Sequence, residues 1–195
     1  MPEDPELTPA EIAPPEVTPK MRASARANPN TWLYVIDPVF DADADVPPWG
    51  VVGAYAVDES GEISGTFSRN TEYRPSPAAL RMPEPASELE RVLQLVKTGH
   101  RDAAELLPAV LAANLLVYAS GEHDREITGF PTKDGVVAIP ACTSVARIPP
   151  AWPGWREVSG RLLAPQLHGH PLVINPNGPI TAMIPAADLA RVSQP

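Results

Sequence analysis

Cys142 is the residue best suited to nucleophilic chemistry, and it stands in the run Pro140–Ser144. A catalytic thiol needs a nearby base and a lowered pKa. The four histidines, at positions 100, 123, 168 and 170, show no spacing that pairs one of them with this cysteine. Because Cys142 continues an apolar run with Val137 and Ile139, we expect a packed small hydrophobic side chain. A cysteine-dependent hydrolase remains an alternative.

Two other patterns carry ligand chemistry: the pair His168 and His170, and aspartates at positions 37, 41, 43 and 45. A zinc site needs three or four protein ligands, and no Cys-x-x-Cys or His-Glu-x-x-His completes one. Counted from Asp41 as a calcium loop, the sixth residue is Val46 instead of glycine, and the twelfth is Val52 instead of glutamate. The sequence predicts no metal, no cofactor and a solvated acidic loop at Asp41–Asp45, with cation binding by that loop left open.

Motifs for phosphate binding and serine hydrolysis are missing from the chain. Gly50-Val51-Val52-Gly53 lacks the further glycine and the following helix of a dinucleotide fingerprint. Lys133 follows no phosphate-loop pattern, and Gly-x-Ser-x-Gly does not occur. These absences favour a binding protein over an enzyme.

Three tryptophans lie beside proline or glycine, where loops are expected. Trp49 stands in Pro-Pro-Trp-Gly, and Trp152 and Trp155 stand in Trp-Pro-Gly-Trp. Aromatic side chains carry much of the energy of protein interfaces, so these three are our candidate partner-binding residues. The alternative is that they fill gaps in a small core.

The charge balance argues against nucleic acid and anionic membranes as partners. Asp and Glu number 24 against 15 Lys and Arg, which gives a formal net charge of -9. No apolar run approaches the roughly 20 residues that cross a bilayer, and the sequence opens on Met1-Pro2-Glu3-Asp4, acidic where a secretory signal is basic. We expect a cytoplasmic protein without stable membrane insertion that binds another protein.

The elements that must position these residues fall into three parts. Six of the 26 prolines fall within the first 19 residues, among several glutamates, so residues 1–19 are expected to form a disordered tail rich in proline and glutamate. Residues 20–82 read as a small β-rich subdomain with a strand at Trp32–Ile36 and a hairpin of Val51–Val57 and Ile63–Phe67. A short helix is expected at Met21–Ala27.

Residues 83–195 mix helical and strand patterns without a steady βαβ rhythm, which indicates an α+β domain with a mixed or antiparallel sheet. Ser87 and Glu90 have the spacing of a capping box at the start of a helix. A second helix is expected from Asp102, a third over Trp155–Leu167 and a last one over Ala186–Val192. Strands are expected at Leu115–Tyr118, Glu126–Phe130, Val136–Ile139, Pro171–Asn175 and Ile180–Ile184.

The last hundred residues resemble the SseB-like domain. The resemblance is carried by Leu115-Leu116-Val117-Tyr118, Ile139-Pro140-Ala141-Cys142-Thr143-Ser144, Val158-Ser159-Gly160-Arg161-Leu162-Leu163 and Leu172-Val173-Ile174-Asn175-Pro176-Asn177-Gly178-Pro179. Residues 28–38 and 46–53 are similar to actinobacterial proteins called type VII secretion system-associated. The fold implied is an N-terminal three-strand unit plus an SseB-like mixed sheet packed against helices.

These resemblances imply a non-enzymatic accessory protein of type VII secretion that acts by protein–protein binding. An immunity protein that neutralises a toxin is the alternative, because an acidic surface also suits a basic active site. The partner is expected to be a secretion component, an effector or a toxin. The SseB-like resemblance transfers no catalytic residue.

Overall fold

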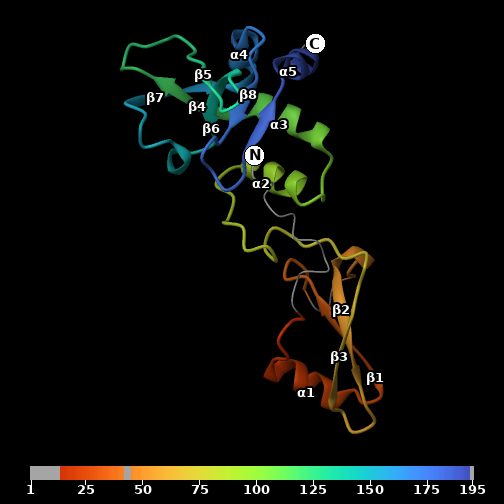
Figure 1. Cartoon of the computed structure of the whole chain (residues 1–195). Helices are drawn as coiled ribbons and strands as arrows, with labels where there is room; N and C mark the ends of the chain where they lie inside the picture. The colour runs from red at the N-terminus through yellow and green to blue at the C-terminus, as the bar shows by residue number, and fades with distance from the viewer. Residues whose placement is uncertain (1–13, 42–44, 194–195) are drawn as a thin grey trace. The chain divides into compact units, whose positions relative to one another are not determined.

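The computed structural model describes residues 14–41 and 45–193, and the chain divides into two compact units (Figure 1). Unit 1 is Met1–Pro83 and unit 2 is Glu84–Pro195. The predicted α+β class is confirmed, with a three-stranded antiparallel sheet in the first unit and a six-stranded mixed sheet in the second. Most of the expected tail, residues 1–13, lies outside the described residues.

Unit 1 is a three-stranded sheet preceded by one helix. Helix α1 (Pro19–Ala27) begins after Thr18, whose hydroxyl accepts a hydrogen bond from the Met21 amide. Strands β1 (Thr31–Ile36), β2 (Val51–Val57) and β3 (Ile63–Arg69) follow in spatial order β1-β2-β3. A 3-10 turn, η1, covers Pro48–Gly50.

The predicted hairpin between β2 and β3 is closed by Asp58. Its Oδ1 accepts hydrogen bonds from the amides of Ser60 and Glu62 and from the Ser60 hydroxyl. These bonds hold the pKa of the Asp58 carboxyl below its ordinary value. Gly61 follows with φ +79°, a left-handed conformation that glycine adopts at little cost.

The sheet of unit 2 runs in the order β7-β4-β6-β8-β9, with the two-residue β5 paired to β6. Only β6 and β8 are parallel neighbours; the other pairs are antiparallel. The bounds are β4 (Asn114–Ala119), β5 (Phe130–Pro131), β6 (Val137–Cys142), β7 (Gly154–Ser159), β8 (Leu172–Ile174) and β9 (Ala182–Ile184).

One face of this sheet forms the core with the helices of unit 2. Alternate strand residues such as Leu115 and Val117 of β4 and Ile139 of β6 belong to this buried core. The helices are α2 (Glu88–Lys97), η2 (Ala103–Glu105), α3 (Leu106–Ala112), η3 (Val145–Arg147), α4 (Gly160–Leu163), η4 (Ala164–Leu167) and α5 (Ala186–Ser193).

The helix expected over Trp155–Leu167 is wrong in its first half. Residues 154–159 form β7, which pairs with β4 along its whole length, and helical structure begins only at Gly160. The apolar spacing of Val158 with Leu162 and Leu163 suggested one helix, but Val158 is a buried strand residue opposite Leu115. Tertiary pairing overrides the helical period here.

The strand expected over Glu126–Phe130 is also shorter than predicted, because only Phe130 and Pro131 pair with β6.

Across the described ranges 14–41 and 45–193, every helix is too short or too polar to span a bilayer.

Candidate functional site

An aromatic cluster lies on the face of the unit 2 sheet opposite the one that Leu115 and Val117 present to the helices. At its centre, the Tyr118 ring meets Phe130 at a centroid distance of 5.1 Å and Trp152 at 5.7 Å, both edge to face. Such pairs stabilise by roughly 0.5–1.5 kcal/mol beyond the area that they bury. Trp155 of β7 stands directly opposite Tyr118 of β4 in the strand register. We name these four residues the aromatic cluster.

Trp155 is the most exposed member of the aromatic cluster. It is 45 % exposed and lies on β7, an edge strand of its sheet, while Trp152 is half-buried beside Tyr118. Phe130 is also exposed. A partly exposed tryptophan on a strand presents a large apolar surface with only two side-chain torsions to fix, which is the character of an interface anchor.

Two of the three tryptophans predicted to bind a partner belong to this cluster, and the third does not. Trp49 is in η1 of unit 1, where its ring packs at 5.3 Å from the ring of Phe40. Its half-buried position shows that Trp49 contributes to local packing. The sequence did not point to Tyr118 or Phe130 as partner-binding residues. One signal for Tyr118 was present: side chains alternate along a strand, so Tyr118 lies on the opposite face of the sheet from Leu115 and Val117.

Cys142, at the end of β6, is fully buried, as the sequence predicts for a packed side chain. Its thiol donates a hydrogen bond to the Arg147 carbonyl oxygen at 3.3 Å. Burial raises the pKa of Cys142 to about 11, which disfavours the reactive thiolate.

The other ligand patterns of the sequence are dispersed. No three of the histidines, aspartates, glutamates and the cysteine within residues 14–41 and 45–193 gather as a metal site would require. Asp37 does not belong to a solvated loop: it is completely buried in unit 1. Part of the expected acidic loop, residues 42–44, lies outside the described residues.

Asp37 is held by four donors from its own turn and from the segment after β3. Its carboxylate accepts hydrogen bonds from the Tyr73 hydroxyl, from the amide and hydroxyl of Ser76, and from the Val39 amide. Burial, together with the hydrogen bond and negative charge of Asp37, raises the pKa of Tyr73 far above its ordinary value. This fully bonded carboxylate ties the proline-rich segment after β3 to the end of β1.

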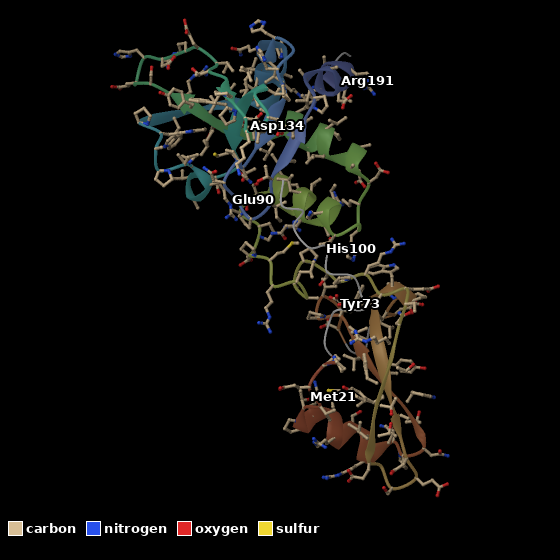
Figure 2. All side chains as sticks on the ribbon, viewed as in Figure 1. Met21, Tyr73, Glu90, His100, Asp134 and Arg191 are labelled. Carbon is tan, nitrogen blue, oxygen red and sulfur yellow. The ribbon has the colours of Figure 1, made fainter. Side chains whose placement is uncertain are left out.

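A second buried carboxylate, Glu90, joins α2 to the ends of the parallel strands. The Glu90 side chain, labelled in Figure 2, accepts hydrogen bonds from the Ala86 amide and from the hydroxyls of Thr143 and Ser144. The Arg147 guanidinium lies 3.4 Å away. Thr143 directly follows β6, so Glu90 fixes the chain where that strand ends.

Asn175 completes this polar cluster from the end of β8. Its Oδ1 accepts from the Thr143 amide at 3.0 Å, and its Nδ2 donates to the Thr143 hydroxyl at 3.0 Å. Its φ of +50° is a left-handed conformation that asparagine tolerates better than most residues. We name Glu90, Thr143, Ser144, Arg147 and Asn175 the polar cluster.

The balance of forces on Glu90 keeps it ionised. Burial by itself raises the pKa of this carboxyl, but the hydrogen bonds from Thr143 and Ala86 and the charge of Arg147 bring the pKa below its ordinary value. A carboxylate with all its acceptors engaged is a structural tie rather than a free general base, because abstraction of a proton would require one of these bonds to open.

A groove of about 280 Å³ lies beside Thr143, between the start of α2 and the end of α3. Its walls are mainly small and apolar, with Leu89, Ala109, Ala112 and Ala113 among them. This lining provides no pair of groups for acid–base chemistry.

Comparison with known proteins agrees with this architecture. The family model described as SseB protein N-terminal domain matches residues 89–191, which is more than half of the 195-residue chain. Searches among curated proteins and among solved structures gave no match. The matched range contains both named clusters of unit 2, and the chain belongs to the SseB family.

Proposed function

We propose that this protein is a non-enzymatic accessory protein of type VII secretion and that it acts by binding another protein through the aromatic cluster. Membership of the SseB family supports the secretion-associated role. The observation that carries the binding role is Trp155, which is exposed on an edge strand and stands opposite Tyr118 in the strand register.

The side chains with chemical potential support binding over catalysis. Cys142 is buried with a raised pKa, and Glu90 is engaged by four groups. Trp155, in contrast, keeps nearly half of its surface exposed, so burial of this surface by a partner would be favourable at about 25 cal/mol per Å² of apolar area.

A matched pair of tryptophan variants tests this proposal. Trp155→Ala removes the exposed anchor of unit 2, whereas Trp32→Ala removes an equally exposed tryptophan, 51 % against 45 %, from β1 of unit 1. Affinity purification from a host with a type VII system should recover components of that system with the unmodified chain and with Trp32→Ala. Recovery should fall at least tenfold with Trp155→Ala. Equal recovery with both variants would refute the role of the aromatic cluster.

A toxin-neutralising role is the second candidate, and the net charge of -9 favours it. A strongly acidic chain suits a basic toxin surface and would associate rapidly at low salt. Co-expression with toxin genes from the same genomic neighbourhood distinguishes the two: rescue of growth supports immunity, and unchanged killing supports the secretion role.

A further inference from the structure

One face of the unit 1 sheet is aromatic and already holds an extended segment of the chain. Tyr55 of β2 stands opposite Leu33 of β1 and Phe67 of β3, so the three side chains share one face. The Tyr55 and Phe67 rings lie 4.7 Å apart at 50°. We name these three residues the Tyr55 face.

Gly53 makes room for this arrangement. A Cβ at position 53 would lie 2.5 Å from the ζ carbon of Phe67 and 2.4 Å from the Ser68 carbonyl oxygen. The absence of a side chain at Gly53 therefore allows the outer edge of the Phe67 ring to approach the β2 backbone.

The segment seated at this face is Pro14–Thr18. The Tyr55 hydroxyl donates a 2.7 Å hydrogen bond to the Pro15 carbonyl oxygen, and Tyr55 is only 4 % exposed. Pro15 and Val17 are half-buried, whereas Pro14, Glu16 and Thr18 face solvent. Thr18 has φ -80° and ψ 161°, so the segment arrives at α1 in an extended conformation.

This contact has the chemistry of proline-rich peptide recognition. Proline has no backbone N–H, so a proline-rich segment cannot be held by a full strand ladder. It offers instead carbonyl acceptors and flat apolar rings, which aromatic side chains and a phenolic hydroxyl match. A segment that is already extended also loses little entropy on binding.

The seated segment takes no part in the strand pairing of the sheet. Within the described part of the chain, the ladder of unit 1 consists of β1, β2 and β3, and Pro14–Thr18 belongs to none of them. Departure of the segment breaks the Tyr55–Pro15 hydrogen bond and exposes apolar surface, but it leaves the strand pairing in place.

We propose that the Tyr55 face is a binding surface for a proline-rich extended segment of a partner protein, which must displace the chain's own Pro14–Thr18. Because the chain's own segment is tethered, it competes at an effective concentration on the order of millimolar. The surface belongs to unit 1 and does not include Trp155, so failure of this proposal leaves the proposed function untouched, and the reverse also holds.

The test weakens the binding of the chain's own segment, Pro14–Thr18, and leaves the residues of the Tyr55 face unchanged. In the full chain, Pro15→Ala with Val17→Ser removes the two half-buried side chains of the segment. A fluorescent peptide with the native sequence of residues 9–20 is then titrated by anisotropy against the unmodified chain and the variant. The variant should bind this peptide at least tenfold more tightly than the unmodified chain does.

Two controls make the outcome decisive. Tyr55→Phe, added to the variant, keeps the aromatic ring but removes the hydroxyl donor. It should lower the affinity for the peptide about fivefold, the equivalent of one neutral hydrogen bond. A peptide with every proline replaced by alanine should bind at least tenfold more weakly. Equal affinity of the unmodified chain and the variant, or no loss with the alanine peptide, would overturn the proposal. If the double change loses the β signal in circular dichroism, Pro15→Ala alone is titrated with the same criteria.

Discussion

Replacement of Glu90 by glutamine should destabilise unit 2 strongly, because it removes the charge and one of the two acceptor oxygens of a buried side chain. The Glu90 carboxylate accepts from the Ala86 amide and the Thr143 hydroxyl and faces Arg147, and its side chain is 5 % exposed. Hydrogen bonds to charged groups each contribute about 1.5–3 kcal/mol. Glutamine keeps one acceptor oxygen, and its NH2 group must face donors in either orientation: the Ala86 amide, or Thr143 with Arg147. We therefore expect a loss of about 3 kcal/mol.

A matched control lies two residues earlier on the same helix. Glu88 faces Arg91 at 3.3 Å, practically the same distance as Glu90 to Arg147 at 3.4 Å. Both side chains of the Glu88 pair are more than 60 % exposed, so Glu88→Gln should cost less than about 1 kcal/mol. The comparison separates the effect of burial from the effect of distance.

Hydrogen exchange of the β6 and β8 amides measures the free energy of opening in unit 2 directly. The lowered pKa of Glu90 means that its stabilisation is complete above the ordinary carboxyl pKa of about 4.3 and is lost as pH falls through the lower folded value. The difference in opening free energy between the unmodified chain and Glu90→Gln should accordingly become smaller at acidic pH. If Glu90→Gln and Glu88→Gln lower the opening free energy equally at neutral pH, this reasoning is refuted.

Three further outcomes are expected. Cys142 should resist a thiol reagent at pH 8 in the folded chain and react fully in urea, because burial raises its pKa to about 11; rapid reaction in the folded state would contradict its packing. Tyr73→Phe should destabilise unit 1 by about 1–3 kcal/mol, since it leaves a buried carboxylate short of a donor. Because the pKa of Tyr73 is raised in the folded chain, its contribution to the stability of unit 1 is present below about pH 10 and is lost as pH rises through the folded pKa. Ultraviolet titration of tyrosine ionisation in the unmodified chain and in Tyr73→Phe measures that pKa. Gly160→Ala should prevent stable folding of unit 2, because the new Cβ would lie 1.9 Å from the Val110 carbonyl oxygen; Gly121→Ala, with open space around it, should have little effect, and similar melting curves for the two would be inconsistent with this close approach.

Most strands, with the exception of β5 and β7, and most helices follow from local sequence pattern. The aromatic and β-branched content of Trp32–Ile36 predicted β1, and two apolar runs around a polar turn at Asp58 predicted the hairpin. Gly99 directly follows Thr98, the C-cap of α2, with φ +73°, the left-handed conformation in which a glycine commonly ends a helix.

The segment from Trp155 to Leu167 shows where local pattern fails. Its apolar spacing fits a helix, but β4 has a free edge that residues 154–159 fill as β7. Nothing local in the sequence specifies that edge, since strand pairing depends on which segments the tertiary fold brings together.

The buried carboxylates were missed for a different reason. Glu90 fits a capping box with Ser87, and Ser87 does accept a hydrogen bond from the Glu90 amide. The Glu90 carboxylate, however, bonds to Ala86, one residue further back, and to the loop after β6. The capping box alone explained the spacing of Ser87 and Glu90. The sequence therefore provided no reason to expect contacts of Glu90 with Thr143 and Arg147, which lie more than 50 residues later.

Site-specific crosslinking at position 155 tests the central claim most directly. A photoreactive amino acid is introduced in place of Trp155, and in a second chain in place of Trp32, in a host with a type VII secretion system. Our account predicts covalent adducts with a type VII component from position 155 and none from position 32. Adducts with that component from position 32 alone would contradict binding through the aromatic cluster, and the absence of any adduct from position 155 would contradict it equally.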